Sequence, residues 1–201
     1  MSRRWMTLLS VGGAMVLALS MALPASAAAT RFGAKLTKST QPHPAMWCDD
    51  PNEEPPHANC TWILTEALQR PNGGQKAPKA GTIGKVRLVS CGPGAFKVQV
   101  ARRVSGTQKY RVVRDGPRIQ YQGDVQGCGD EDDLEYRVES FSTNFRVNKG
   151  DMIAIKAKRA GTIQCSGANL PVFAPPLVAG GNARKPTNSQ GCYLLVEWQY
   201  K

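Results

Sequence analysis

The chain has 201 residues, and its 26 Lys and Arg outnumber its 15 Asp and Glu, so the formal net charge is +11. This length suits one domain with a sizeable core, and the sequence shows no internal repeat and no second domain. The charge argues for association with anionic partners and says nothing about the fold.

Residues 1–27 have the features of a secretory signal peptide. Arg3 and Arg4 precede an apolar run over residues 6–23, and Ala25-Ser26-Ala27 forms a small-residue cleavage site. The sequence has no second hydrophobic span, so we expect a secreted, extracellular protein with no transmembrane segment after processing. Because residues 1–27 hold two basic residues and no acid, their removal lowers the net charge from +11 to +9. Residues 28–201 are then the single folded domain.

Six cysteines remain after processing. An even number in an exported chain predicts three disulfide bonds, not thiol chemistry or a zinc site. We expect sequential pairing, because the first two cysteines bracket a proline-rich loop and each later pair would tie a strand end to a long irregular segment. The expected bonds are Cys48–Cys60, Cys91–Cys128 and Cys165–Cys192.

Short runs of alternating apolar and polar residues recur along the mature chain, and no helical period is established. A turn is expected at Asp115-Gly116-Pro117, and a Pro- and Gly-rich loop over residues 171–188. The expected strands cover residues 32–37, 61–68, 82–90, 96–104, 110–113, 118–121, 136–147, 152–158, 162–165 and 193–200.

Residues 136–158 form the most clearly patterned segment, and they predict a β-hairpin that turns at residues 148–151. Ile153 and Ile155 alternate with Lys156 and Lys158, so one face of the second strand should be buried and the other exposed. A β-bulge near residues 139–140 would bring both apolar sets of the first strand onto one core. We expect this hairpin to lie at the centre of a sheet.

About nine or ten strands separated by turns, with no helices between them, predict an all-β protein folded as an antiparallel β-sandwich. A jelly roll is the expected topology, and an immunoglobulin-like sandwich is the alternative.

Several segments carry a resemblance to a known family. They are CGPGAFKVQVAR from Cys91, VVRDGPRIQYQGD from Val112, YRVESF with VNKGDMIAIKAK, IQCSGANLPVFAPPL from Ile163 and GCYLLVEWQYK from Gly191. In this order they resemble an uncharacterised family of secreted single-domain β-sandwich proteins of high-GC Gram-positive bacteria. The resemblance covers roughly residues 32–200 and implies an exported, disulfide-containing sandwich. It carries no activity and no catalytic residues.

Basic residues are segregated along the chain: residues 70–118 hold 12 of them against the single acid Asp115. Such segregation predicts a positive surface region that could bind an extracellular polyanion, such as a wall polymer or acidic polysaccharide. The alternative is that these side chains only solvate an exposed sheet and protect its edges. The sequence contains no recognised nucleic-acid module, so no specific nucleic-acid partner is expected. The candidate polyanion-binding residues are Arg102, Arg103, Arg111, Arg114 and Arg118.

No cofactor is expected. The acidic run Asp130, Glu131, Asp132 and Asp133 could supply oxygens to calcium, but its spacing does not match an EF-hand, and a solvated loop is the preferred interpretation. His43 and His57 lie in proline-rich sequence near four acids, where a transition-metal site is the weaker alternative to no specific role.

Catalysis has one candidate in the sequence. Gly-x-Ser-x-Gly is absent and no histidine lies on an expected strand, which disfavours Ser-His-Asp or Cys-His hydrolysis. Glu66 shares its phase with Trp62 and Leu64, so it is expected to point inward, with Glu139 or Glu197 as a second carboxylate. A buried Glu66 paired with a Lys or Arg is the simpler interpretation.

Two functions therefore stay open. The first is a secreted, non-enzymatic binding or surface protein, whose ligand is a glycan or a polyanionic wall polymer; here Trp47 could stack on a sugar. The second is a carbohydrate-active enzyme, a jelly-roll glycoside hydrolase or polysaccharide lyase, that uses Glu66 and a second carboxylate.

Overall fold

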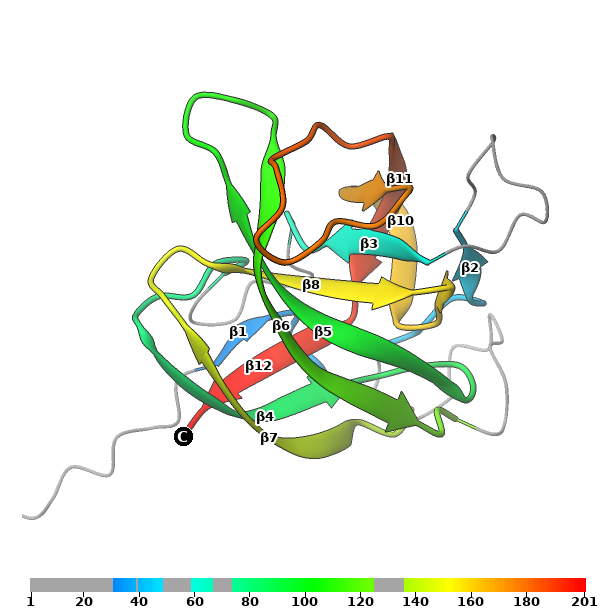
Figure 1. The fold of residues 1–201 in the computed structure, drawn as a ribbon. Coiled ribbons are helices and arrows are strands. Elements are labelled where there is room, and N and C mark those ends of the chain that lie inside the picture. Colours follow the sequence, from blue (N-terminus) through cyan, green and yellow to red (C-terminus); the bar gives the residue numbers. More distant parts are fainter. Residues whose placement is uncertain (1–30, 39, 49–58, 67–73, 125–135) are drawn as a thin grey trace, which may run out of the picture.

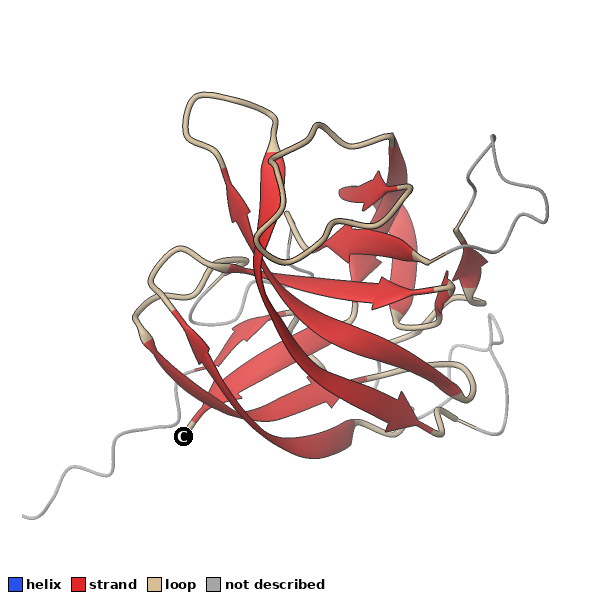
Figure 2. Cartoon of the chain, in the orientation of Figure 1, coloured by secondary structure: helices blue, strands red, loops and turns tan. Residues whose placement is uncertain are grey.

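The structure, a computed structural model, describes residues 31–38, 40–48, 59–66, 74–124 and 136–201. Over these ranges the chain forms twelve strands and no helix (Figure 2). The strands are β1 Arg31–Gly33, β2 Met46–Trp47, β3 Cys60–Ile63, β4 Gly81–Leu88, β5 Gly94–Arg103, β6 Tyr110–Tyr121, β7 Glu139–Val147, β8 Met152–Ala157, β9 Arg159–Ala160, β10 Ile163–Phe173, β11 Asn188–Leu194 and β12 Val196–Tyr200.

The strands form two main antiparallel sheets that pack face to face (Figure 1). The four-stranded sheet has the order β1-β12-β4-β7, and the six-stranded sheet has the order β11-β10-β3-β8-β5-β6. A small third pair joins β2 to β9. The all-β antiparallel sandwich expected from the sequence is therefore confirmed, whereas these strand orders do not confirm a jelly roll.

The core between the sheets is formed by the side chains of each strand that point toward the opposite sheet. Trp198 of β12 packs edge-on against Phe32 of β1 and Phe145 of β7, with ring centroids 5.6 and 4.9 Å apart. From the opposite sheet, Trp62 and Ile155 are 0% and 1% exposed and belong to the same cluster. These large apolar side chains bury the surface that holds the sheets together.

The predicted hairpin at residues 148–151 is wrong, because the strands on either side of that turn belong to different sheets. β7 pairs with β4 and forms an edge of the four-stranded sheet, whereas β8 lies between β3 and β5 at the centre of the six-stranded one. The bulge of β7 falls opposite residues 83–85 of β4, not at residues 139–140. Both expectations assumed that consecutive strands pair, but here the chain crosses the sandwich.

The burial predicted for β8 is confirmed on its inward face. Ile153 and Ile155 are buried and Lys158 is exposed, while Lys156 is half-buried. Ala154, on the outward phase, is also fully buried. The cause is a covering loop, so β8 has apolar contacts on both faces along its first half.

The covering loop, residues 174–187, joins β10 to β11 and lies over part of the outer face of the six-stranded sheet (orange in Figure 1). Leu177 of this loop packs in a second cluster with Ile63, Ala154 and Phe173. The side chain of Gln99 donates a hydrogen bond to the Leu177 carbonyl (3.2 Å), and the Leu177 amide donates one to Thr61 (3.0 Å). The loop thus covers one end of this face and leaves the other end open.

The turn predicted at Asp115-Gly116-Pro117 is wrong as well: β6 runs through it without interruption. Between Lys97 and Gln99 β5 advances by two residues, whereas the paired β6 advances by three from Arg118 to Asp115, which is a β-bulge. Pro117 is tolerated here because β6 is an edge strand. Gly116 is needed because a Cβ would lie 2.8 Å from the side chain of Val98.

Two of the predicted disulfides are present, Cys48–Cys60 and Cys165–Cys192. The second joins residues directly opposite each other on β10 and β11. Cys128 lies outside the described residues, so the Cys91–Cys128 bond stays a prediction, as does the signal peptide at residues 1–27. Disulfide bonds are typical of proteins from oxidising, extracellular compartments. Among the described residues, no helix is long and apolar enough to span a membrane.

Non-reducing peptide mapping of the purified protein should give three disulfide-linked peptide pairs and no free thiol. Replacing Cys48 and Cys60 with Ser should lower the free energy of unfolding by about 2–3 kcal/mol. The loss is modest because the loop that this disulfide closes is short. A crossed pairing of Cys91 or Cys128 would contradict the sequential assignment.

Candidate functional site

A row of cations crosses three strands of the six-stranded sheet at the end that the covering loop leaves open. Lys97 of β5 lies directly opposite Lys156 of β8 on one side and Arg118 of β6 on the other. Their neighbours Phe96, Ile155 and Ile119 point into the core, so the three basic side chains share the outer face. Directly opposed residues have Cβ atoms about 5 Å apart, and like charges at that distance repel.

These cations line a hollow of about 430 Å³. The sheet supplies its floor, where Gly94 and Ala95 of β5 have small or no side chains. We call it the basic hollow, and its five cationic residues are Lys97, Arg118, Lys156, Lys158 and Arg159.

The rim of the basic hollow is fixed by the small sheet β2-β9. Trp47 of β2 pairs with Arg159 of β9, and the Arg159 guanidinium lies over the indole ring, 5.4 Å from its centroid. The amide of Cys48 donates a hydrogen bond to the Lys158 carbonyl (3.0 Å), and Cys48 is itself tied to β3 by its disulfide. The backbone that carries Lys158 and Arg159 is therefore held by residues 47–48, which are themselves tied to β3.

One carboxylate partly balances the basic hollow. Asp115 forms an ion pair with Lys97 (2.8 Å) and accepts a hydrogen bond from the side-chain amide of Gln99 (2.9 Å). Partial burial raises the pKa of Asp115, but the bonds from Lys97 and Gln99 and the charges of Lys97 and Lys156 outweigh it, so the pKa lies below its ordinary value. Among the described residues, no other carboxylate forms an ion pair with the five cations. The hollow therefore keeps a net positive charge.

A smaller hollow of about 280 Å³ adjoins the basic hollow, because Arg159 lines both. We call it the tyrosine hollow, since Tyr121 lies in it beside Ser90 and Gly161. Burial raises the pKa of the Tyr121 hydroxyl, against the opposing effects of its hydrogen bonds with Ser90 and Gly161 and of the nearby Arg159 charge. Tyr121 therefore stays protonated at neutral pH and presents a neutral hydroxyl.

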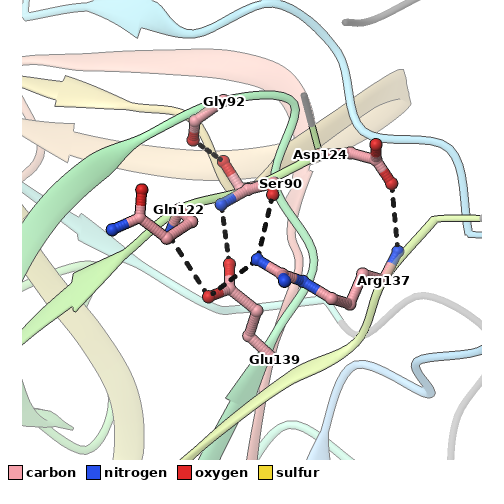
Figure 3. A network of polar contacts seen from close by, with 7 residues as sticks. Ser90, Gly92, Gln122, Asp124, Arg137 and Glu139 are labelled. Carbon is pink, nitrogen blue, oxygen red and sulfur yellow. Dashed lines mark hydrogen bonds and ion pairs between the residues drawn. The ribbon is translucent and has the colours of Figure 1, made fainter. Parts of the chain in front are cut away.

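Glu139, a candidate catalytic partner, has a structural role in a polar network at the end of β6 (Figure 3). Its carboxylate accepts hydrogen bonds from the backbone amides of Gln122 (3.2 Å) and Gly123 (2.7 Å), and it lies 3.6 Å from the guanidinium of Arg137. Since β6 and β7 are edges of different sheets, this network joins the two sheets at their open side.

The predicted polyanion-binding arginines do not gather at one place. Arg118 lines the basic hollow. Arg102 pairs with the buried Asp151 (2.6 Å), and Arg114 donates to the Arg146 carbonyl of β7 (2.9 Å). Arg103 binds the Thr107 carbonyl, and Arg111 is exposed on β6.

The inward orientation predicted for Glu66 is wrong, because β3 ends at Ile63 and Glu66 is exposed beyond it. Glu66 lines a third hollow of about 490 Å³, which we call the polar hollow and which also contains Arg103, Lys185 and Asn169. Among the described residues that line it, Glu66 is the only carboxylate.

The other two carboxylates considered for catalysis lie elsewhere. Glu139 belongs to the polar network and Glu197 to the outer face of the four-stranded sheet, where Glu197 is buried against Arg87 (2.5 Å) and Arg31 (3.8 Å). The structure thus does not bring Glu66 together with either of them.

No group of three or more metal-ligating side chains occurs among the described residues. His43 is half-buried, while His57 and the predicted calcium ligands, residues 130–133, lie outside the described part of the chain.

Sequence reasoning missed four of the five cations of the basic hollow. Lys97 was inside the basic segment, but Lys156, Lys158 and Arg159 come from a distant segment and reach the site through the pairing of β8 with β5. The alternation of Lys156 and Lys158 with apolar residues along and just after β8 was the available signal. It showed a basic face without showing what lies beside it.

Comparisons with family models, with curated proteins and with solved structures each gave no match. The resemblance to secreted sandwich proteins of high-GC Gram-positive bacteria accordingly stays a prediction.

Proposed function

We propose that the protein is a secreted extracellular binding protein whose basic hollow holds an acidic polymer, such as an anionic glycan or wall polymer. The observation that supports this most is the gathering of five cations from β5, β6 and residues 156–159 at one hollow against one carboxylate. Cations that oppose each other across strands repel, so a bound anion would relieve that repulsion.

The shape of the site suits a polymer better than a small molecule. The basic hollow lies on the outer face of the six-stranded sheet and continues through Arg159 into the tyrosine hollow, which is lined mainly by loop residues. A chain with repeated charges could contact Arg118 at one end and Arg159 at the other. Several weak ion pairs would then act together on one ligand.

Binding is favoured over the alternative of a carbohydrate-active enzyme by the position of Glu66. Retaining and inverting glycosidases use two carboxyl groups on either side of the scissile bond. The polar hollow has one carboxylate among its described lining residues, and Glu139 and Glu197 are held in other contacts.

Replacing Arg118 and Lys158 together with Gln should weaken binding to heparin roughly ten-fold or more at low salt, because two exposed cations of the basic hollow are lost. Wild-type affinity should itself fall roughly ten-fold or more between low and physiological ionic strength, since counterion release drives the binding. Titrations at two salt concentrations measure both effects.

The matched control replaces Lys109 and Arg111 with Gln, which removes one Lys and one Arg that are also exposed but lie outside the basic hollow. Both double variants lose the same net charge. The control should therefore lower heparin affinity by less than about two-fold. Equal losses in the two double variants would show that general charge, not the basic hollow, binds the polymer.

A further inference from the structure

The aromatic ring at the rim of the basic hollow points to the chemical class of the ligand. Trp47 is 43% exposed, although tryptophan usually buries most of its surface. Val178 is the only other large hydrophobic side chain that is exposed among the described residues, and it belongs to the covering loop. The exposed indole lies beside the cations, because Trp47 pairs with Arg159 and contacts its guanidinium.

The indole is held in place instead of hanging free in solvent. β2 pairs with β9, the next residue Cys48 is bonded to Cys60, and the preceding Met46 packs with its Sδ 3.7 and 3.6 Å from the sulfurs of Cys165 and Cys192. Two disulfides thus support a strand of two residues. A ring fixed before binding loses little conformational entropy when a ligand stacks on it.

We propose that the ligand is an acidic polysaccharide, in which one sugar ring stacks on Trp47 while its charged substituents pair with Arg159 and the lysines of the basic hollow. The C–H groups on one face of a pyranose carry partial positive charge and pack against the negative face of an indole. The cation–π contact covers one face of the ring with Arg159, so the sugar takes the other face and its anionic group meets the guanidinium at the edge of the ring. This inference rests on the proposed function of the basic hollow.

The arrangement fits a sugar polymer better than a sugar-free polyanion or a single-stranded nucleic acid. Inorganic polyphosphate has no ring to stack, so it would leave the fixed indole unused. Proteins that bind single strands place successive bases on several aromatic side chains. Among the described residues, Trp47 is the one exposed aromatic ring beside the cations.

The test compares polygalacturonate, inorganic polyphosphate and single-stranded DNA as probes for the whole secreted protein. Trp47→Ala should weaken binding to polygalacturonate roughly ten-fold while changing polyphosphate binding by less than about two-fold. Trp47→Phe keeps a stacking ring and should retain polygalacturonate affinity within about three-fold. The double change of Arg118 and Lys158 to Gln should weaken the binding of both polymers.

Three outcomes would overturn the inference while leaving the basic hollow as a polyanion site. In the first, Trp47→Ala changes the binding of neither polymer. In the second, it weakens the binding of both polymers equally, because Arg159 has moved. In the third, single-stranded DNA binds most tightly of the three probes and its binding depends on Trp47. If the wild-type protein binds none of the three probes, the proposed function itself fails. Thermal unfolding of each variant, with midpoints within a few degrees of wild type, shows that the comparison is between folded proteins.

Discussion

Replacing Ile155 with Ala should lower the free energy of unfolding by about 2–5 kcal/mol, through the lost transfer of the side chain from water and the cavity that remains. Ile155 is 1% exposed on the central strand β8, directly opposite Trp62 of β3 and Val98 of β5. Its neighbours are large and are held by strands on both sides, so they can collapse only partly into the space. Urea or guanidinium unfolding, followed by tryptophan fluorescence, measures the change.

Lys158→Ala is the matched control for this change, because Lys158 lies three residues further along the chain and is exposed. It should alter the free energy of unfolding by less than about 0.5 kcal/mol. An unchanged denaturation midpoint for Ile155→Ala would show that β8 is not at the centre of the core.

Asp151→Ala should destabilise the fold by about 2–4 kcal/mol, although Asp151 lies in a turn. The carboxylate is 2% exposed, and one of its oxygens accepts bonds from the Arg102 guanidinium at 2.9 and 2.6 Å. The other oxygen accepts a bond from the Asn148 amide at 2.7 Å. The change removes all three bonds and leaves Arg102 without its carboxylate. Removing one partner of a fully buried ion pair costs several kcal/mol. The cost is smaller here because the Arg102 side chain is 36% exposed.

Asp115→Ala separates the loss of a buried ion pair from the loss of any ion pair. Asp115 also pairs with a cation, Lys97, but the side chains are 35% and 47% exposed. An exposed pair contributes about 0–1 kcal/mol, and the buried Gln99 amide that also donates to Asp115 keeps its bond to the Leu177 carbonyl, so this variant should unfold at nearly the wild-type denaturant concentration. Equal destabilisation by the two changes would contradict the structural role given to the Arg102–Asp151 pair.

The pair also shows why Arg102 does not serve as a test of polyanion binding. From the sequence, Arg102 and Arg118 are equivalent basic residues on two expected strands. The structure gives Arg102 a buried carboxylate as partner and leaves Arg118 on an open hollow. Only the tertiary fold, which brings the turn at Asp151 beside Arg102 of β5, distinguishes the two.

The period-two pattern was enough to predict the β-sandwich and much of its core. Leu194, Val196, Trp198 and Tyr200, which share one phase, are all buried as that pattern requires. The pattern did not reveal that the chain changes sheets at Leu195, between β11 and β12. A continuous alternation looks the same whether one strand runs on or two strands meet at a crossing between sheets.

The same limit explains the site. Local sequence predicted a basic face on β8 and a basic segment around β5 and β6, but pairing between β5 and β8 is a long-range event that depends on how the whole sandwich winds. The covering loop adds a second long-range effect, since it decides which end of the sheet stays open. Neither could be derived from turn residues or alternation.

The most direct test of the basic hollow is a two-dimensional amide NMR titration of the isotope-labelled protein with a short galacturonic acid oligomer. We expect the shift changes to concentrate at residues 94–97, Arg118, Tyr121 and residues 156–159, which line the basic hollow and its junction with the tyrosine hollow. The indole N–H of Trp47 should shift with them. Shift changes confined to the polar hollow around Glu66 and Asn169, or spread evenly over the basic surface, would contradict the account.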